Sequence, residues 1–74
     1  MTAHGVVLFH GTQAALRAEK VLQKALLTVK LVPTPRQFSS DCGVALRFAW
    51  SDEGPVRDRL ATAKVEIDVI HPLE

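Results

Sequence analysis

The chain has 74 residues, of which 47% are hydrophobic and 23% are charged, and its nine basic and eight acidic residues give a formal net charge of +1. This length and composition predict one globular domain over residues 1–74 with a modest core, and they exclude a disordered chain. The opposite charges alternate along the sequence, which argues against nucleic acid or an anionic membrane as a partner.

The N-terminal half predicts a strand, a helix and a second strand. After a ragged start over residues 1–5, the apolar run at 6–10 predicts a central strand that is covered on both faces or nearly so. Thr12 is the expected N-cap of a helix over residues 13–26, where apolar side chains recur at spacings of three and four. A second strand over residues 28–32 ends at Pro33 and Pro35, since prolines so close together do not fit inside a sheet.

The C-terminal half predicts a strand, a helix and a strand after a serine-containing loop over residues 36–43. Apolar residues alternate with period two at 44–50, including Trp50, which indicates a third strand. Residues 51–55 have the capping residue, acids and proline of a helix start. A fourth strand is expected over 66–70, ended by His71 and Pro72. Leu73 and Glu74 are interpreted as a scar of cloning and are given no functional role.

The order strand–helix–strand–strand–helix–strand predicts a fold class. It is typical of an α+β, ferredoxin-like βαββαβ sandwich, in which two helices cover one face of a four-stranded antiparallel sheet and strands one and three are central. In that topology the 36–43 loop lies at the same end of the sheet as the end of strand one. We therefore expect Cys42 to lie near His10, Gly11 and Thr12.

Cys42 is the only cysteine, and two interpretations of it compete. A free cysteine is often a small buried hydrophobic residue. Its neighbours Ser39, Ser40 and Asp41 are polar, however, and Gly43 leaves the sulfur open to a partner and permits an unusual backbone conformation. These neighbours favour a reactive thiol at the rim of a loop.

The charge on the sulfur depends on opposing influences. An ordinary thiol has a pKa of about 8.5, so little thiolate is present at neutral pH. A nearby helix N-terminus, together with Arg36 and Arg47, favours the thiolate. Asp41 acts in the opposite direction, because a neighbouring carboxylate disfavours an anion.

Other polar residues have a structural and a chemical interpretation each. His10 is either an ordinary histidine at a strand end or a group that accepts a proton from Cys42. Ser39 and Ser40 either fix the loop by hydrogen bonds to its amides or stabilise an anion on sulfur or selenium, and the two uses are compatible. The three histidines and Cys42 lack the paired spacing of a zinc site, so we expect no metal and no cofactor.

Three runs of the sequence resemble a known family. The runs Leu31 to Arg36 and Ser39 to Phe48, with Ala15 to Lys20 in the first helix, are similar to the small bacterial domains described as putative Se/S carrier protein-like. The resemblance extends from about Val6 to Ile70. It implies that Cys42 carries sulfur or selenium within a loop formed with Arg36, Ser39, Ser40 and Gly43. No element of the family matches His10.

The resemblance implies a carrier more than an enzyme, with sulfur or selenium donor and acceptor proteins as partners. The sequence has a single cysteine and shows neither a leader-like nor a long apolar segment, and these features together indicate a reducing cytoplasm. The alternative is a non-catalytic interaction or dimerisation module of ferredoxin-like fold in which Cys42 only packs. A redox sensor, whose disulfide would join two molecules, is a third interpretation. So short a chain has no covalent crosslink to stabilise it, and because oligomerisation can supply that stability, a homodimer is kept as an expectation.

Overall fold

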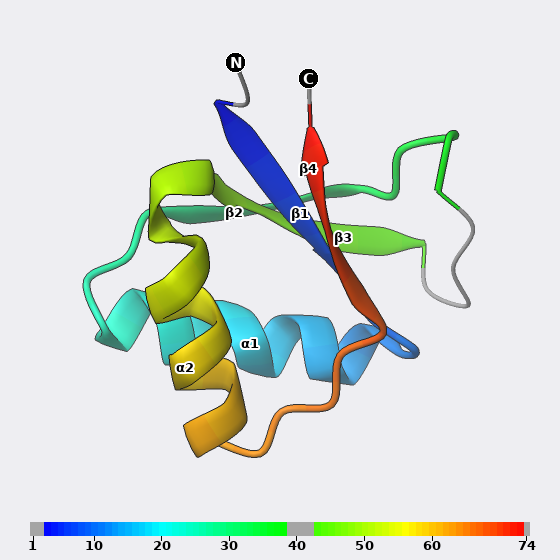
Figure 1. The fold of residues 1–74 in the computed structure, drawn as a ribbon. Coiled ribbons are helices and arrows are strands. Elements are labelled where there is room, and N and C mark those ends of the chain that lie inside the picture. Colours follow the sequence, from blue (N-terminus) through cyan, green and yellow to red (C-terminus); the bar gives the residue numbers. More distant parts are fainter. Residues whose placement is uncertain (1–2, 39–42, 74) are drawn as a thin grey trace.

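The computed structural model describes residues 3–38 and 43–73, and their order of elements confirms the predicted fold class. Strands β1 (His4–Leu8), β2 (Val29–Pro33), β3 (Val44–Ala49) and β4 (Val69–Leu73) form one sheet in the order β2-β3-β1-β4, antiparallel throughout. Helices α1 (Thr12–Lys24) and α2 (Glu53–Thr62) pack on one side of it (Figure 1). This is the ferredoxin-like order, with β1 and β3 in the centre as predicted.

The main core lies between the helices and the sheet. It is built from apolar residues that recur with helical spacing in α1 and α2 and with period two in the strands. Its buried members are Val7, Phe9, Ala15, Ala18, Leu22, Leu46, Phe48, Val56, Leu60, Val65 and Ile70. The apolar run at the start of the chain is buried on both of its faces, because Val6 and Leu8 point away from this core and are still almost fully covered.

Both helices end in the same way. Beyond α1, the amide of Leu27 donates to the carbonyl of Leu22, and beyond α2 the amide of Val65 donates to that of Leu60, each at 3.0 Å. The residues between, Leu26 and Lys64, take positive φ angles of 63° and 56°. These are Schellman-type ends, in which an apolar residue after the turn packs back onto the helix.

Several predicted boundaries were wrong. β1 begins at His4, inside the segment expected to be ragged, and it ends at Leu8 rather than at His10. The N-cap of α1 is Gly11, with no side-chain cap hydrogen bond, so Thr12 is the first helical residue and not the cap. Trp50 begins a short 3₁₀ helix, Trp50–Asp52, instead of ending β3.

The fourth strand is displaced by three residues from its predicted position. β4 spans Val69–Leu73 and contains Pro72, which lies opposite Gly5. A proline is tolerated there because β4 is an edge strand and needs ladder hydrogen bonds on one side only. Leu73 belongs to β4 and packs against the cluster of Val6, Leu8 and Ala45.

Candidate functional site

The strand register shows at which end of the sheet the loop between β2 and β3, the loop that contains Cys42, is attached. Leu8 pairs with Ala45 and with Val69, and Pro33 pairs with Val44. The ends of β1 and β2 therefore meet the starts of β3 and β4 at one end of the sheet, which confirms the predicted arrangement of these strand ends. The segment between β1 and α1, with His10 and Gly11, leaves the sheet at this end.

A hydrogen bond closes the loop between β2 and β3 at its base. The amide of Thr34 donates to the carbonyl of Gly43 at 3.1 Å, which extends the β2–β3 ladder by one step beyond its last register pair. Within the loop, the amide of Phe38 donates to the carbonyl of Pro35 at 3.0 Å and forms a tight turn. These bonds fix both described arms of the loop relative to the sheet.

The predicted carrier residue lies outside the described residues. This holds for Cys42 and equally for Ser39, Ser40 and Asp41. Gly43, which follows Cys42, is exposed, and a Cβ placed on it would meet no atom within 4 Å. It does not have a positive φ, so the unusual backbone conformation that glycine permits is not used at this position.

Phe38 lies over the sheet face that the helices leave open. Its ring stacks on that of His71 in β4, with centroids 4.3 Å apart and planes 2° from parallel. It also packs against the buried cluster of Val6, Leu8 and Ala45. The loop that starts from β2 at one edge of the sheet thus reaches β4 at the other edge. Sequence reasoning missed this role, although an aromatic residue in a serine-containing loop was a usable signal.

His10 and Thr12 lie at the same end of the sheet, in surroundings the sequence did not predict. The Nε2 atom of His10 is 3.9 Å from Oδ1 of Asp68, just before β4, and its side chain is 55% exposed. The amide of Asp68 donates to the carbonyl of Leu8 at 2.7 Å, which holds this carboxylate beside the end of β1. His10 therefore faces an acidic neighbour, and its proposed relation to Cys42 stays a prediction.

The two predicted arginines occupy different places. Arg36 is exposed in the turn of the loop. Arg47 is exposed on β3, where it lies opposite Lys30 on one side and Val6 on the other. It is three residues beyond Val44, which is about 10 Å along a strand. Arg47 is therefore separated from the base of the loop and lies within a group of basic residues on the open face.

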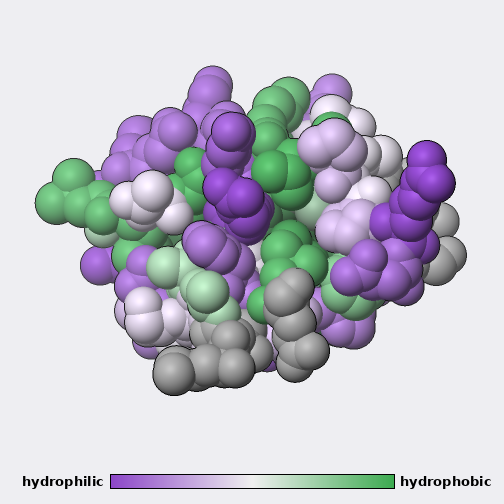
Figure 2. Space-filling model, turned by 90° about the horizontal axis from the view of Figure 1, so that it is seen from above, coloured by the Kyte–Doolittle hydropathy of each residue, from purple (hydrophilic) through white to green (hydrophobic). Residues whose placement is uncertain are grey.

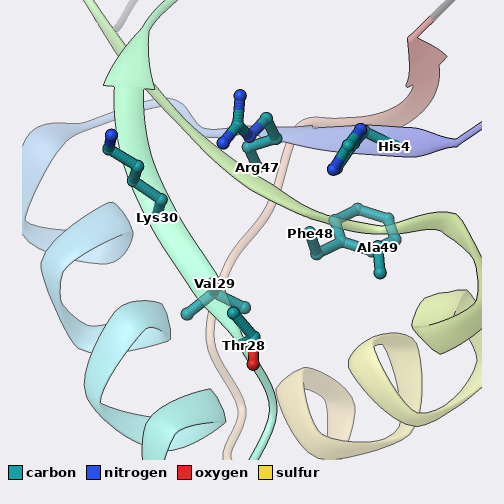
Figure 3. Close-up of a pocket in the computed structure, with 7 residues that line it drawn as sticks. All are labelled: His4, Thr28, Val29, Lys30, Arg47, Phe48 and Ala49. Carbon is teal, nitrogen blue, oxygen red and sulfur yellow. The ribbon is translucent and has the colours of Figure 1, made fainter.

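Lys30, Arg47 and His4 lie around a hollow of about 100 Å³ that opens on the sheet (Figure 3). Its other lining residues come from the segment Thr28–Val29 and from Phe48–Ala49. Sequence reasoning did not assign Lys30 or His4 to any site, because only the strand register brings them next to Arg47.

The described part of the chain contains no group of three or more metal-ligating side chains. It also contains no helix that is both long and apolar enough to cross a membrane.

Comparison with known proteins gives one family. A family model described as "Putative Se/S carrier protein-like" matches residues 4–72, nearly the whole chain. Neither the curated proteins nor the solved structures give a significant match.

Proposed function

The chain belongs to the putative Se/S carrier protein-like family, and on this premise we propose that it carries sulfur or selenium on Cys42 and passes it to a partner protein. The family match over residues 4–72 is the observation that carries the proposal. The fold supports it, because the loop containing Cys42 has a hydrogen-bonded base at one end of a rigid sheet. The carrier acts without a bound cofactor, in the cytoplasm, and alongside donor and acceptor proteins.

The chemical step is a thiol exchange. The Cys42 thiolate attacks the outer sulfur of a persulfide on the donor protein. A new S–S bond forms at Cys42, the S–S bond of the donor breaks, and the donor sulfur leaves as a thiolate that takes up the proton lost by Cys42. The acceptor nucleophile then attacks the terminal sulfur and releases the Cys42 thiolate. Neither step consumes an external oxidant or reductant, and a selenium atom follows the same course.

The supporting residues have roles that follow from their chemistry. Ser39, Ser40 and the backbone around Gly43 donate hydrogen bonds to the terminal anion, and Arg36 adds positive charge from the same loop. His10 and Thr12 belong to the neighbouring segment at this end of the sheet, where His10 assists proton transfer.

The proposal predicts that the chain gains mass when it is incubated with a cysteine desulfurase and cysteine, or with a selenocysteine-cleaving enzyme and selenocysteine. Mass spectrometry of the intact protein should show the addition of one sulfur or selenium atom, reversed by a reducing thiol. The variant Cys42→Ser should show none.

A relocated thiol provides the matched control. In the Cys42→Ser background, Ser51→Cys places one cysteine at an exposed position away from the loop. The proposal expects much slower loading of this variant than of the natural chain. Equal loading would mean that any accessible thiol suffices. If the natural chain is not loaded and the thiol of Cys42 reacts only after unfolding, the result would favour the interaction module, in which Cys42 only packs.

A further inference from the structure

The open face of the sheet is divided between an apolar half and a basic half. On one half, Phe38 and Leu73 cover the cluster of Val6, Leu8 and Ala45. On the other half, Lys30, Arg47 and His4 are exposed on β2, β3 and β1, which are neighbours in the sheet. Figure 3 shows the three side chains, and the ends of Lys30 and Arg47 are directed to the same side. Lys30 lies opposite Arg47, and His4 lies two residues before Val6, which is the residue of β1 opposite Arg47. We call these three residues the basic patch.

The charges of the basic patch are not compensated within the described residues. Lys30 and Arg47 are a direct cross-strand pair, an arrangement in which like charges destabilise a sheet. None of the ion pairs between described residues involves either of them. The four strands contain no acidic residue at all. The fold thus carries a local electrostatic cost that a ligand with negative charge would relieve.

A hollow beside the basic patch provides a place for part of a ligand. Seen from the side away from α1, hydrophilic side chains lie among apolar ones (Figure 2). The hollow of about 100 Å³ between Lys30, Arg47 and His4 has room for the carboxylate end of one side chain. A guanidinium such as that of Arg47 binds a carboxylate through two parallel hydrogen bonds, whereas an ammonium such as that of Lys30 acts as a compact point charge.

Arg47 of the basic patch and the ring stack of Phe38 on His71 lie on the same face of the sheet, with β1 between them. Val6 pairs with Arg47 on one side and with His71 on the other, and Phe38 stacks on His71. Lys30, Arg47 and His71 therefore lie in the same row of the sheet, and β1 separates Arg47 from His71 by about 10 Å. His4 lies on β1, two residues before Val6. A protein that covers the basic patch extends to Phe38, four residues before Cys42 in the sequence.

We propose that His4, Lys30 and Arg47 form the docking surface for a protein partner that presents aspartate and glutamate side chains, one of which enters the hollow. That this partner is the donor or the acceptor rests on the proposed carrier function. The patch fixes the partner beside the loop and selects acidic surfaces, since complementary charge contributes to specificity and to the rate of association.

The experiment measures binding of poly-L-glutamate as the carboxylate probe, by calorimetry and by amide chemical shifts at low salt. Lys30→Gln/Arg47→Gln removes one lysine and one arginine from the basic patch. Lys20→Gln/Arg59→Gln removes the same charges from exposed positions of α1 and α2 and is the matched control. We expect the patch variant to lose about 10-fold or more in affinity and the control to stay within about twofold. The shifts should map to β1, β2 and β3.

Several results would overturn the proposal. Equal losses in the two double variants would show that only net charge matters. Tighter binding of inorganic phosphate or of a single-stranded oligonucleotide at the same residues would assign the patch to phosphate groups instead. Circular dichroism checks that each variant is folded, and Arg47→Gln alone replaces the double variant if it is not.

The docking and carrier proposals are separable by experiment. The binding measurements are made in the Cys42→Ser background, where no sulfur is carried. Loading with sulfur is measured on the natural chain and on Lys30→Gln/Arg47→Gln with Cys42 present. If the natural chain is loaded with sulfur but does not bind poly-L-glutamate, the docking proposal is refuted and the carrier proposal stands. If it binds poly-L-glutamate but is not loaded, the carrier proposal is refuted and the docking surface stands.

Discussion

At the residue scale, Gly5 shows how a single position is fixed by its neighbours. A Cβ at Gly5 would lie 2.5 Å from the ring of Trp50 and 2.8 Å from that of Phe48. These two rings are themselves stacked at 5.9 Å, and the amide of Trp50 donates to the carbonyl of Ala3 at 3.1 Å. Trp50 therefore covers a glycine in a central strand, where the ring replaces the side chain that glycine lacks.

This packing predicts that Gly5→Ala destabilises the protein by about 1–3 kcal/mol, because the added methyl group forces the two rings apart. Urea denaturation followed by the fluorescence of the single tryptophan measures the change. Gly43→Ala is the matched control, since a Cβ at Gly43 meets no atom within 4 Å and Gly43 has no positive φ, so alanine fits its backbone conformation. We expect the control to be neutral or more stable, and similar losses in both variants would contradict the steric explanation.

At the scale of elements, the β2–β3 loop is a structural part of the sheet as well as the place of Cys42. Phe38 covers residues of β1 and β3 and stacks on β4, so one loop contacts three of the four strands. Together with Val32 and Leu73, this contact explains why Val6 and Leu8 are buried although no helix lies over that face. The stability of the open face and the position of the candidate loop are therefore coupled.

Phe38→Ala should lower the free energy of unfolding by about 1–2 kcal/mol, since a half-buried aromatic ring is removed. Amide hydrogen exchange should also become faster in β1 and β4, whose open-face side chains lose their cover. Phe38→Leu keeps apolar cover without the ring stack and should retain part of the stability. Unchanged exchange in both strands of Phe38→Ala would show that the loop does not protect this face.

At the scale of the whole molecule, charge is distributed by layer. The strands carry basic residues and no acidic ones, while the described acidic residues lie in the helices and in the segments that connect elements. The nearly neutral total charge of +1 conceals this separation. The total charge contained no information about a local basic patch.

This distribution predicts a conflict between stability and docking at Lys30. Lys30→Glu places opposite charges in the cross-strand pair with Arg47, so we expect a gain of about 0.5–1 kcal/mol at low salt. The gain should shrink at ~1 M salt because of screening. The same variant should lose poly-L-glutamate binding. Denaturation at both salt concentrations, together with calorimetry, measures the two effects.

Arg59→Glu is the control for this prediction, because it changes the net charge equally on an exposed position of α2. Arg59 has no basic residue three or four positions away, and a negative charge near a helix C-terminus is unfavourable. A comparable gain in both variants would mean that net charge alone accounts for the effect at Lys30.

The sequence by itself determined the fold class, the two central strands and the end of the sheet at which the loop lies. These follow from local periodicity, since period two and period 3.6 identify strands and helices without knowledge of their partners. It also made Cys42 the candidate carrier residue, because this lone cysteine lies among polar residues and the runs around it resemble one family. It placed β4 three residues too early, because His71 and Pro72 were interpreted as the end of the strand, whereas an edge strand tolerates a proline within it.

Only the tertiary structure decided which distant residues become neighbours. The stacking of Phe38 on His71 and the pairing of Lys30 with Arg47 depend on strand register, where a slip of one residue would move each side chain to the other face. The close packing of Trp50 over Gly5 likewise depends on how the chain turns after β3. These contacts join segments far apart in the sequence, so no local pattern of residues contains them.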